Sequence, residues 1–298
     1  MIKREMYMSR IRPFIGSELI KVVTGIRRSG KSVMLELVKQ ELIESGVSTD
    51  NFISFNFEDM NYAALCNAKA LHDEITARAK SIQGKIYLFF DEIQEVTDWE
   101  KCINSLRVSI DCDIYITGSN AKLLSGELAT YLAGRYVEFV IYPFSFAEFI
   151  DMYKSVIPHE SIQQCFQKYL IYGGMPYLGK LQYAEEPVRQ YLCDVFNSVQ
   201  LKDIIKRNNV RDVDLLERIM AYIMANVGAT FSASSLSKFL KNERRNVAPE
   251  TILNYIKYCS DAYLFYQVKR QDLKGKQIIS TNEKYYIADH GIREAVFG

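Results

Sequence analysis

Strong net charge and closely spaced soft-metal ligands are both missing from this sequence of 298 residues. Its formal net charge of +1 provides no overall field that would draw it to nucleic acid or to a membrane surface. Its six cysteines include no C-x-x-C pair, which predicts reduced thiols in a cytoplasmic protein. Its three histidines lie far apart in the sequence, so a zinc site is not expected.

Long hydrophobic runs are missing as well. No apolar stretch approaches the length of about 18 residues that a membrane-spanning helix needs. The N-terminal segment 1–30 is charged and contains Pro13 and Gly16, so no signal peptide is expected either. The hydrophobic content of 48% is nevertheless sufficient for well-packed cores, and the length predicts two or three structural modules.

A phosphate-binding loop motif lies near the N-terminus. Residues 25–32, GIRRSGKS, match G-x-x-x-x-G-K-[ST] at every fixed position. An apolar run over 19–24 predicts a strand before the motif, and residues 33–38 predict a helix after it. In such a loop the backbone N–H groups and the helix N-terminus face the phosphates. We therefore predict a nucleotide-binding loop made of Gly25, Ile26, Arg27, Arg28, Ser29, Gly30, Lys31, Ser32 and Val33.

Within this loop the side chains have different expected roles. Lys31 is expected to reach the β- and γ-phosphates, and the Ser32 hydroxyl is expected to hold Mg²⁺. Arg27 and Arg28 either contact phosphate or an acidic partner, or face solvent, because the motif requires only the backbone and the lysine. The alternative for the whole motif is an ordinary glycine-containing turn between a strand and a helix.

A second motif makes that alternative less attractive. Residues 85–92, KIYLFFDE, form an apolar run that ends in Asp91 and Glu92, as expected for a strand buried on both faces of a parallel sheet. Ligands of such sheets bind at the carboxyl ends of the strands. We predict that Asp91 holds the Mg²⁺ shell and that Glu92 serves the attacking water, since neighbouring side chains of a strand point opposite ways. The alternative is a solvated acidic turn.

The first half of the chain alternates strands and helices, which predicts an α/β fold. The expected strands are 20–24, 52–57, 85–90, 113–117 and 135–142, and the expected helices are 31–45, 67–81, 98–109 and 120–130. This pattern predicts a P-loop NTPase core of three layers with a parallel sheet over residues 1–145. One further strand, 52–57, lies between the two motif strands in the sequence, as in P-loop ATPases in which an extra strand separates them. Trp99 is expected to pack in the core.

The rest of the chain predicts helices and then a hairpin. Residues 146–210 are expected to form a helical lid, or alternatively a helical spacer without nucleotide contact, from helices over 145–154, 159–172 and 186–207. Residues 211–298 predict a winged helix-turn-helix: helices lie over 212–227, 232–240 and 249–258, and strands over 263–269 and 284–288 follow them.

The predicted winged helix has a local basic charge. Residues 230–280 hold nine Lys and Arg against four Asp and Glu, which suits phosphate contacts. The basic side chains lie between the helices and on the wing: Arg244, Arg245, Lys269, Arg270, Lys274 and Lys276. The second helix offers few side chains for reading bases, so contact with another domain or with a protein partner is the alternative to DNA binding.

These segments together resemble a known family: prokaryotic AAA-like P-loop ATPases that carry a winged helix and usually a nuclease-like C-terminal domain. The resemblance is carried by GIRRSGKSVML, FISFNFED, YLFFDEIQEVTDWEKCINSL, IYITGSNAKLLSGELATYLAGRYVEFVIYPFSFAEF, YGGMP and KYYIADHGIREAVFG. Members usually continue for about another hundred residues beyond the position of Gly298, so a shortened form or a truncated piece is expected here, without the nuclease-like part.

The resemblance implies three more site residues. Ser119 and Asn120 stand where the family places a polar sensor of the γ-phosphate, although both residue types also favour helix N-caps. Arg135 stands where the family places an arginine that offsets transition-state charge. It acts in its own subunit or in a neighbour, or it simply pairs with surface acids. Glu58 and Asp59 end the second strand and either approach the metal or form a solvated turn.

Two functions fit these residues. The leading hypothesis is Mg²⁺-dependent ATP hydrolysis that moves the lid and the winged helix, with Lys31, Glu92, Ser119, Asn120 and Arg135 at the site. The alternative is a slow nucleotide-gated switch that recruits DNA or a protein partner, and association with further copies of the chain is open. A small-molecule kinase suits the adjacent carboxylates less well. No N/T-K-x-D motif for guanine is present, which favours ATP.

Overall fold

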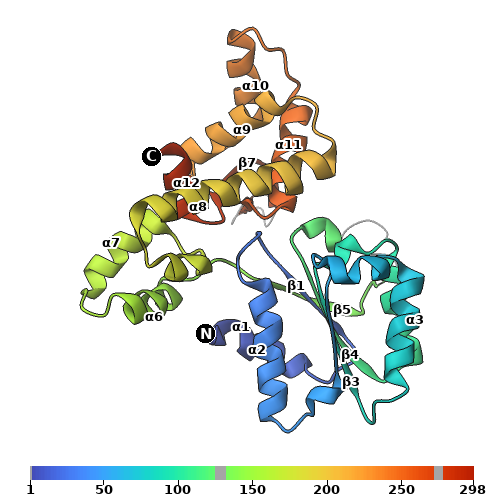
Figure 1. The fold of residues 1–298 in the computed structure, drawn as a ribbon. Coiled ribbons are helices and arrows are strands. Elements are labelled where there is room, and N and C mark those ends of the chain that lie inside the picture. Colours follow the sequence, from blue (N-terminus) through green and yellow to red (C-terminus); the bar gives the residue numbers. More distant parts are fainter. Residues whose placement is uncertain (1, 125–131, 272–277) are drawn as a thin grey trace. The chain divides into compact units, whose positions relative to one another are not determined.

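The computed structural model describes residues 2–124, 132–271 and 278–298 (Figure 1). They form two compact units: the first comprises Met1–Gly25 with Ser29–Ile141, and the second comprises Ile26–Arg28 with Tyr142–Gly298. The predicted division into a core of 1–145, a lid of 146–210 and a winged helix of 211–298 stays a prediction.

The first unit contains a parallel sheet of five strands (Figure 1). All neighbouring strands in it pair in parallel, which confirms the predicted α/β class. The strands are β1 (Ile20–Thr24), β2 (Phe52–Asn56), β3 (Ile86–Asp91), β4 (Cys112–Gly118) and β5 (Tyr136–Val140), in the order β2-β3-β4-β1-β5. As expected, one strand lies between the two motif strands β1 and β3 in the sheet. That strand is β4 rather than β2, which forms an edge of the sheet.

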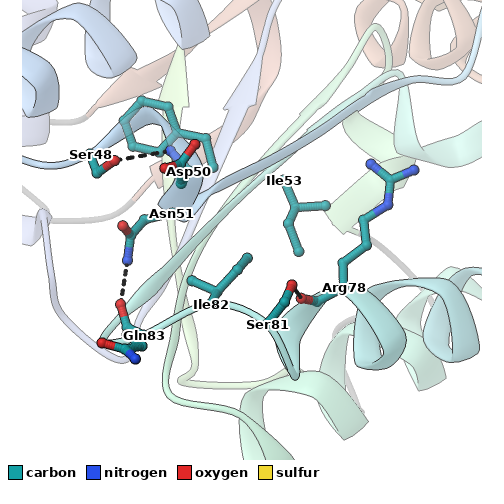
Figure 2. Close-up of a pocket in the computed structure, with 9 residues that line it drawn as sticks. Ser48, Asp50, Asn51, Ile53, Arg78, Ser81, Ile82 and Gln83 are labelled. Atoms are coloured by element: carbon teal, nitrogen blue, oxygen red, sulfur yellow. Dashed lines mark hydrogen bonds between the residues drawn. The ribbon is translucent and has the colours of Figure 1, made fainter.

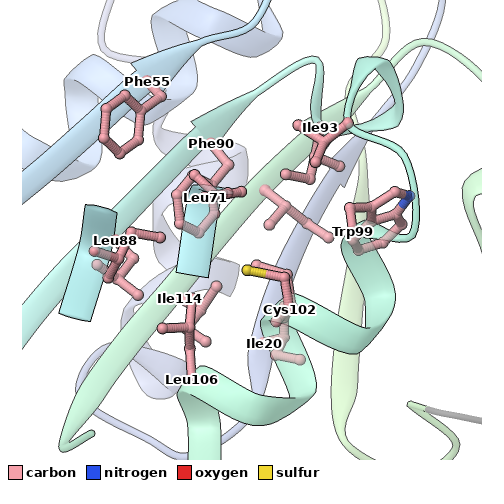
Figure 3. Packing of buried hydrophobic residues seen from close by; sticks show 14 of the residues in the cluster. Ile20, Phe55, Leu71, Leu88, Phe90, Ile93, Trp99, Cys102, Leu106 and Ile114 are labelled. Carbon is pink, nitrogen blue, oxygen red and sulfur yellow. The ribbon is translucent and has the colours of Figure 1, made fainter. Parts of the chain in front are cut away.

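Helices cover both faces of this sheet and produce the predicted three layers. They are α1 (Glu5–Ile11), α2 (Lys31–Glu44), α3 (Ala68–Ala79) and α4 (Trp99–Ser109). Side chains alternate between faces along each strand. Ile20 and Val22 therefore join the core of α3 and α4, whereas Val23 joins that of α1 and α2. Figure 3 shows the first of these cores, in which Trp99 is buried as predicted. Of the helix expected over 120–130, a 3-10 turn, η5 (Ala121–Leu124), is described; residues 125–130 lie outside the described residues.

One charged side chain lies inside the sheet. Lys21, in the middle of β1, is fully buried and forms an ion pair with the equally buried Asp113 of β4. Burial lowers the pKa of Lys21, and the Asp113 carboxylate opposes that shift. Asp113 also accepts hydrogen bonds from the Tyr115 hydroxyl at 2.9 Å and from Gly16 N–H at 2.7 Å. Such saturation of a buried carboxylate offsets much of its desolvation cost.

In the part of the second unit that the structure describes, the named elements are helices and one antiparallel strand pair. Its elements are α6 (Phe146–Val156), α7 (Ile162–Tyr172), α8 (Glu185–Ser198), the π-helical segment η7 (Val199–Lys206), α9 (Val213–Ala225), α10 (Ala233–Asn242), α11 (Pro249–Asp261), β6 (Phe265–Gln271), β7 (Ile278–Ile287) and α12 (His290–Phe297). Three helices followed by an antiparallel pair is the order that a winged helix needs, and that assignment stays a prediction. The basic residues Lys274 and Lys276 lie outside the described residues.

In the second unit, the Asp289 carboxylate joins the segment of Gly173 and Gly174 to the start of α12. The Asp289 carboxylate caps α12 by accepting Ile292 N–H at 3.1 Å, and it accepts Gly174 N–H at 2.7 Å. A Cβ added to Gly173 would lie 2.1 Å from Asp289 Oδ1, so this close approach requires glycine. Burial raises the pKa of Asp289, and its backbone N–H donors oppose the rise.

Removing this carboxylate should destabilise the second unit. We expect Asp289→Ala to lower the free energy of unfolding by about 2–4 kcal/mol, because two buried N–H groups lose their acceptor and α12 loses its cap. Asp289→Asn keeps an acceptor oxygen and should cost less, and Asp194→Ala on exposed helix surface should cost little. Urea unfolding measures all three variants. An unchanged midpoint for Asp289→Ala would contradict the capping role.

Candidate functional site

The predicted phosphate-binding loop connects β1 to α2. Gly25 and Gly30 have φ angles of 137° and 99°, which side chains with a Cβ rarely adopt. A Cβ on Gly25 would also lie 2.2 Å from the carbonyl oxygen of Ile141. The loop ends at Lys31, the first residue of α2, whose side chain is 5% exposed and whose Nζ lies 3.3 Å from the Gly25 carbonyl oxygen. The local conformation is thus that of a strand–loop–helix phosphate site.

The two predicted acids follow β3 and are buried beside β4. Asp91 and Glu92 are 7% and 9% exposed. The Thr117 hydroxyl, near the end of β4, donates to Asp91 Oδ1 and accepts Glu92 N–H at 2.8 Å. Burial raises the pKa of Asp91, while hydrogen bonds from Thr117 and Ser32 oppose the rise. The Ser32 and Asp91 oxygens predicted to share a metal therefore lie together.

Glu92 is surrounded by hydrogen-bond donors. The Ser119 hydroxyl lies 2.8 Å from Oε1 and 2.7 Å from Oε2, and the amide Nε2 of Gln94 donates to Oε2 at 2.5 Å. Lys31 Nζ lies 3.8 Å from Oε1. Asn120 is buried next to Ser119 and directly precedes η5, and its carbonyl oxygen accepts Leu123 N–H at 3.0 Å. Its sensor and cap roles both stay open.

The structure adds Thr117 and Gln94 to the site. Thr117 lies in the apolar strand β4, and a single hydroxyl in such a strand forms no recognisable motif. Gln94 follows the acidic pair by two residues, and only the backbone turn at Glu92, with a φ of 54°, directs its amide back to the carboxylate. Neither contact produces a spacing motif.

This cluster fits Mg²⁺. The Ser32 hydroxyl and the Asp91 carboxylate supply hard oxygen ligands, which Mg²⁺ prefers, and the ion usually completes its shell with phosphate oxygens and waters. The buried Ser29 hydroxyl oxygen has no hydrogen-bond partner among the described residues, so the loop has a hydroxyl group that can still bond a ligand. Over the described ranges no group of three or more His, Cys, Asp or Glu side chains could enclose a metal ion.

Arg135 is not brought to this cluster. It immediately precedes β5, and its carbonyl oxygen accepts the N–H of Ile20, the first residue of β1. In a parallel sheet that is the edge opposite to the one where β1 leads into the loop. Its exposed guanidinium donates to Asn104 Oδ1 at 3.0 Å. Action of Arg135 in its own subunit is therefore not supported, since the strand register holds it away from Lys31; action in a neighbour stays a prediction.

The weaker sequence candidates are placed as follows. Arg27 Nε lies 3.1 Å from Asp203 Oδ2 within the second unit, so it contacts an acid, whereas Arg28 is exposed. Glu58 and Asp59 are exposed, and Asp59 caps a 3-10 turn by accepting Asn61 N–H at 2.9 Å. These positions favour the solvated-turn alternative for both acids.

A pocket of about 590 Å³ lies elsewhere in the first unit, around the start of β2 and the end of α3 (Figure 2). The Asn51 amide at its wall donates to the carbonyl oxygen of Gln83 at 2.9 Å. Its one cationic side chain, Arg78, pairs with Glu74 and lies over the ring of Phe55. The pocket is at the amino end of β2, away from Lys31 and Asp91, so we do not assign the nucleotide to it.

The strand order, the loop and the acidic pair define a P-loop NTPase domain of the AAA class. In agreement, a family profile described as an AAA domain matches residues 17–150. A second profile, described as a domain of unknown function, matches residues 163–298.

Comparison with curated proteins places the chain more narrowly. It is 40% identical over 299 residues to an uncharacterized protein of Haemophilus influenzae, an alignment that covers 100% of this chain and 74% of that protein. It is 31% identical over 283 residues to an uncharacterized protein of Methanocaldococcus jannaschii, covering 91% of this chain and 60% of that one. The chain belongs to the same family as the Haemophilus influenzae protein, and it spans three fifths to three quarters of the length of these two relatives.

Solved structures with a similar course of the chain are more distant. The Aeropyrum pernix ORC1 protein in complex with DNA is 13% identical with a TM-score of 0.41, covering 99% of this chain and 92% of that one. AMPPCP-bound DnaA from Aquifex aeolicus is 14% identical with a TM-score of 0.38, covering 87% and 88%. Separately, none of the helices that the structure describes is long and apolar enough to cross a membrane.

Proposed function

We propose that this chain binds ATP with Mg²⁺ and hydrolyses it. The observation that carries the proposal is that Lys31, at the start of α2, and Asp91 and Glu92, at the end of β3, meet in one buried cluster. A buried lysine beside a glycine loop suits polyphosphate binding. A buried carboxylate one residue after the metal-binding acid suits activation of water.

Each residue has one task in this mechanism. The loop amides and Lys31 bind and orient the phosphates, while Ser32 and Asp91 would hold Mg²⁺. When bound, Mg²⁺ neutralises charge that develops on the phosphate oxygens. Glu92 orients a water and takes its proton as the water oxygen attacks the γ-phosphorus, the bond from that phosphorus to the β–γ bridging oxygen breaks, and ADP leaves. Ser119 contacts the phosphate or the water. The reaction thus depends on positioning and charge stabilisation rather than on a covalent intermediate.

Steady-state phosphate release tests the proposal. The purified chain with ATP and Mg²⁺ is expected to release phosphate, to lose that activity when EDTA removes the metal, and to prefer ATP to GTP. Light-scattering mass in the same solutions shows whether ATP brings copies together, which Arg135 acting in a neighbour requires. Absence of phosphate release under all these conditions would remove hydrolysis as the function.

A slow nucleotide-gated switch is the second candidate, and one observation favours it. The Glu92 carboxylate already accepts hydrogen bonds from Ser119 and Gln94, so both of its oxygens are engaged before a water reaches them. In this state the chain would hold ATP without rapid turnover and would recruit DNA or a protein through its C-terminal part. Adding duplex DNA or a cell extract to the phosphate-release assay distinguishes a stimulated switch from a constitutive ATPase.

The surface available for DNA is smaller than the sequence indicates. Arg245 forms ion pairs with the carboxylates of Asp214 and Asp212, the second at 3.8 Å. Neutralised in this way, it contributes little to phosphate binding. We therefore place protein or interdomain contact ahead of DNA as the use of residues 211–298, and salt-dependent binding of duplex DNA would reverse that order.

A further inference from the structure

The bond between Gln94 and Glu92 has a use within the proposed ATPase. Gln94 lies in the 3-10 turn η4 (Ile93–Glu95), which begins directly after Glu92. Its Nε2 donates to Glu92 Oε2 at 2.5 Å. The other carboxylate oxygen, Oε1, is the one 3.8 Å from Lys31 Nζ, on the side where phosphate is expected. The two oxygens of the predicted base are therefore not equivalent.

The orientation of the Gln94 amide is determined by this carboxylate. Its oxygen Oε1 is buried and has no hydrogen-bond partner among the described residues. A flipped amide would place that oxygen against Glu92, acceptor against acceptor, and would lose the hydrogen bond. A buried polar atom is costly to leave unpaired, so the contact with Glu92 decides how the side chain lies.

The end of β4 leaves space for the amide. A Cβ added to Gly118 would lie 2.7 Å from Leu123 Cδ2 and 2.9 Å from Gln94 Oε1, so a side chain at this position would crowd both Leu123 and the Gln94 amide. Gly118 directly precedes Ser119, whose hydroxyl bonds the same carboxylate. The turn η4 and the end of β4 thus enclose Glu92 from two sides.

We propose that Gln94 is a positioning residue for Glu92, a role that depends on the ATPase function proposed above. Ser119 and Lys31 come from other elements and are the groups expected to turn to a bound γ-phosphate. Gln94 lies in the turn that adjoins Glu92, so its hydrogen bond to Glu92 is kept when the nucleotide binds. By occupying Glu92 Oε2, Gln94 directs Glu92 Oε1 to the attacking water. Glu92 Oε1 receives the proton as the water oxygen bonds to the γ-phosphorus, the bond from that phosphorus to the β–γ bridging oxygen breaks, and ADP leaves.

Gln94→Met tests this role, because methionine has nearly the same length and volume but no donor. We expect kcat for ATP to fall about tenfold, while KM and the affinity for a fluorescent ATP analogue stay within about twofold, since small misplacement of a catalytic group costs rate rather than binding. Gln94→Asn has a donor that is one methylene too short and should show the same loss. Gln40→Met is the control, because Gln40 donates to Glu44 at 3.0 Å on the exposed face of α2.

The outcomes separate this proposal from the one on which it rests. A wild-type kcat in Gln94→Met overturns the positioning role and leaves the ATPase function standing. Loss of nucleotide affinity together with kcat in both Gln94 variants assigns the residue to packing and also overturns it. Absence of turnover in the wild-type chain overturns the ATPase function, and the positioning role with it.

Discussion

Glu92→Gln is expected to bind ATP with near wild-type affinity and to lower kcat by about 10²–10³-fold, the usual contribution of a general base. Glutamine keeps the size of the side chain and accepts a hydrogen bond from Ser119, but it cannot take a proton from water. The substitution weakens the contact with Lys31 but creates no steric clash, because Lys31 Nζ lies 3.8 Å from Glu92 Oε1. Phosphate release and nucleotide titration measure the two effects separately.

Glu95→Gln provides the matched control for this substitution. Glu95 lies in the same 3-10 turn, but its side chain is exposed, so kcat should stay within about twofold of wild type because it touches no reacting group. Normal turnover in Glu92→Gln would remove Glu92 as the base. Slow turnover in both variants would indicate that the turn as a whole, rather than one carboxylate, is required.

Lys31→Ala has the second large expected effect, on binding. The buried ammonium is expected to contact the β- and γ-phosphates, and each charge-assisted hydrogen bond contributes about 1.5–3 kcal/mol. Its loss should raise the Kd for ATP by about 10²-fold or more, which abolishes binding at micromolar nucleotide. Isothermal titration with ATP and Mg²⁺ measures the change.

A neighbouring lysine of the same helix separates this effect from damage to α2. Lys39 bonds the Glu36 carboxylate and the Ser54 hydroxyl on the outer face of the first unit. Lys39→Ala should leave the Kd for ATP within about twofold, since the residue lies two turns beyond the loop. Unchanged affinity in Lys31→Ala, with a normal unfolding midpoint, would contradict the assignment of the phosphate site.

Much of the first unit could be predicted because its signals are local. The five strands have the predicted places within a few residues, since continuous apolar runs between helical patterns indicate buried parallel strands. The loop 25–32 and the pair Asp91 and Glu92 were recognised because each motif is contiguous. The lateral order of the strands was not predictable in this way. The strand between β1 and β3 is β4, and the sequence of residues 112–118 contains no signal for which strands lie beside it.

The contacts within the site depended on that order. Thr117 reaches Asp91 because β4 lies beside β3, although the two residues are 26 positions apart. For the same reason Lys21, in the apolar run of β1, finds Asp113 on the neighbouring strand. Register likewise moves Arg135 to the opposite edge from the loop. Such pairings join residues distant in sequence and leave no spacing to detect.

By itself, therefore, the sequence predicted a phosphate-binding turn after one strand of an α/β fold and an acidic end on another, because both depend on backbone conformation and burial within a few consecutive residues. Only the tertiary structure decided which hydroxyls and amides surround the acids, which charged groups are paired inside the sheet, and at which edge of the sheet Arg135 lies. Those outcomes follow from strand order and side-chain packing across the sheet, which bring together groups that are far apart along the chain.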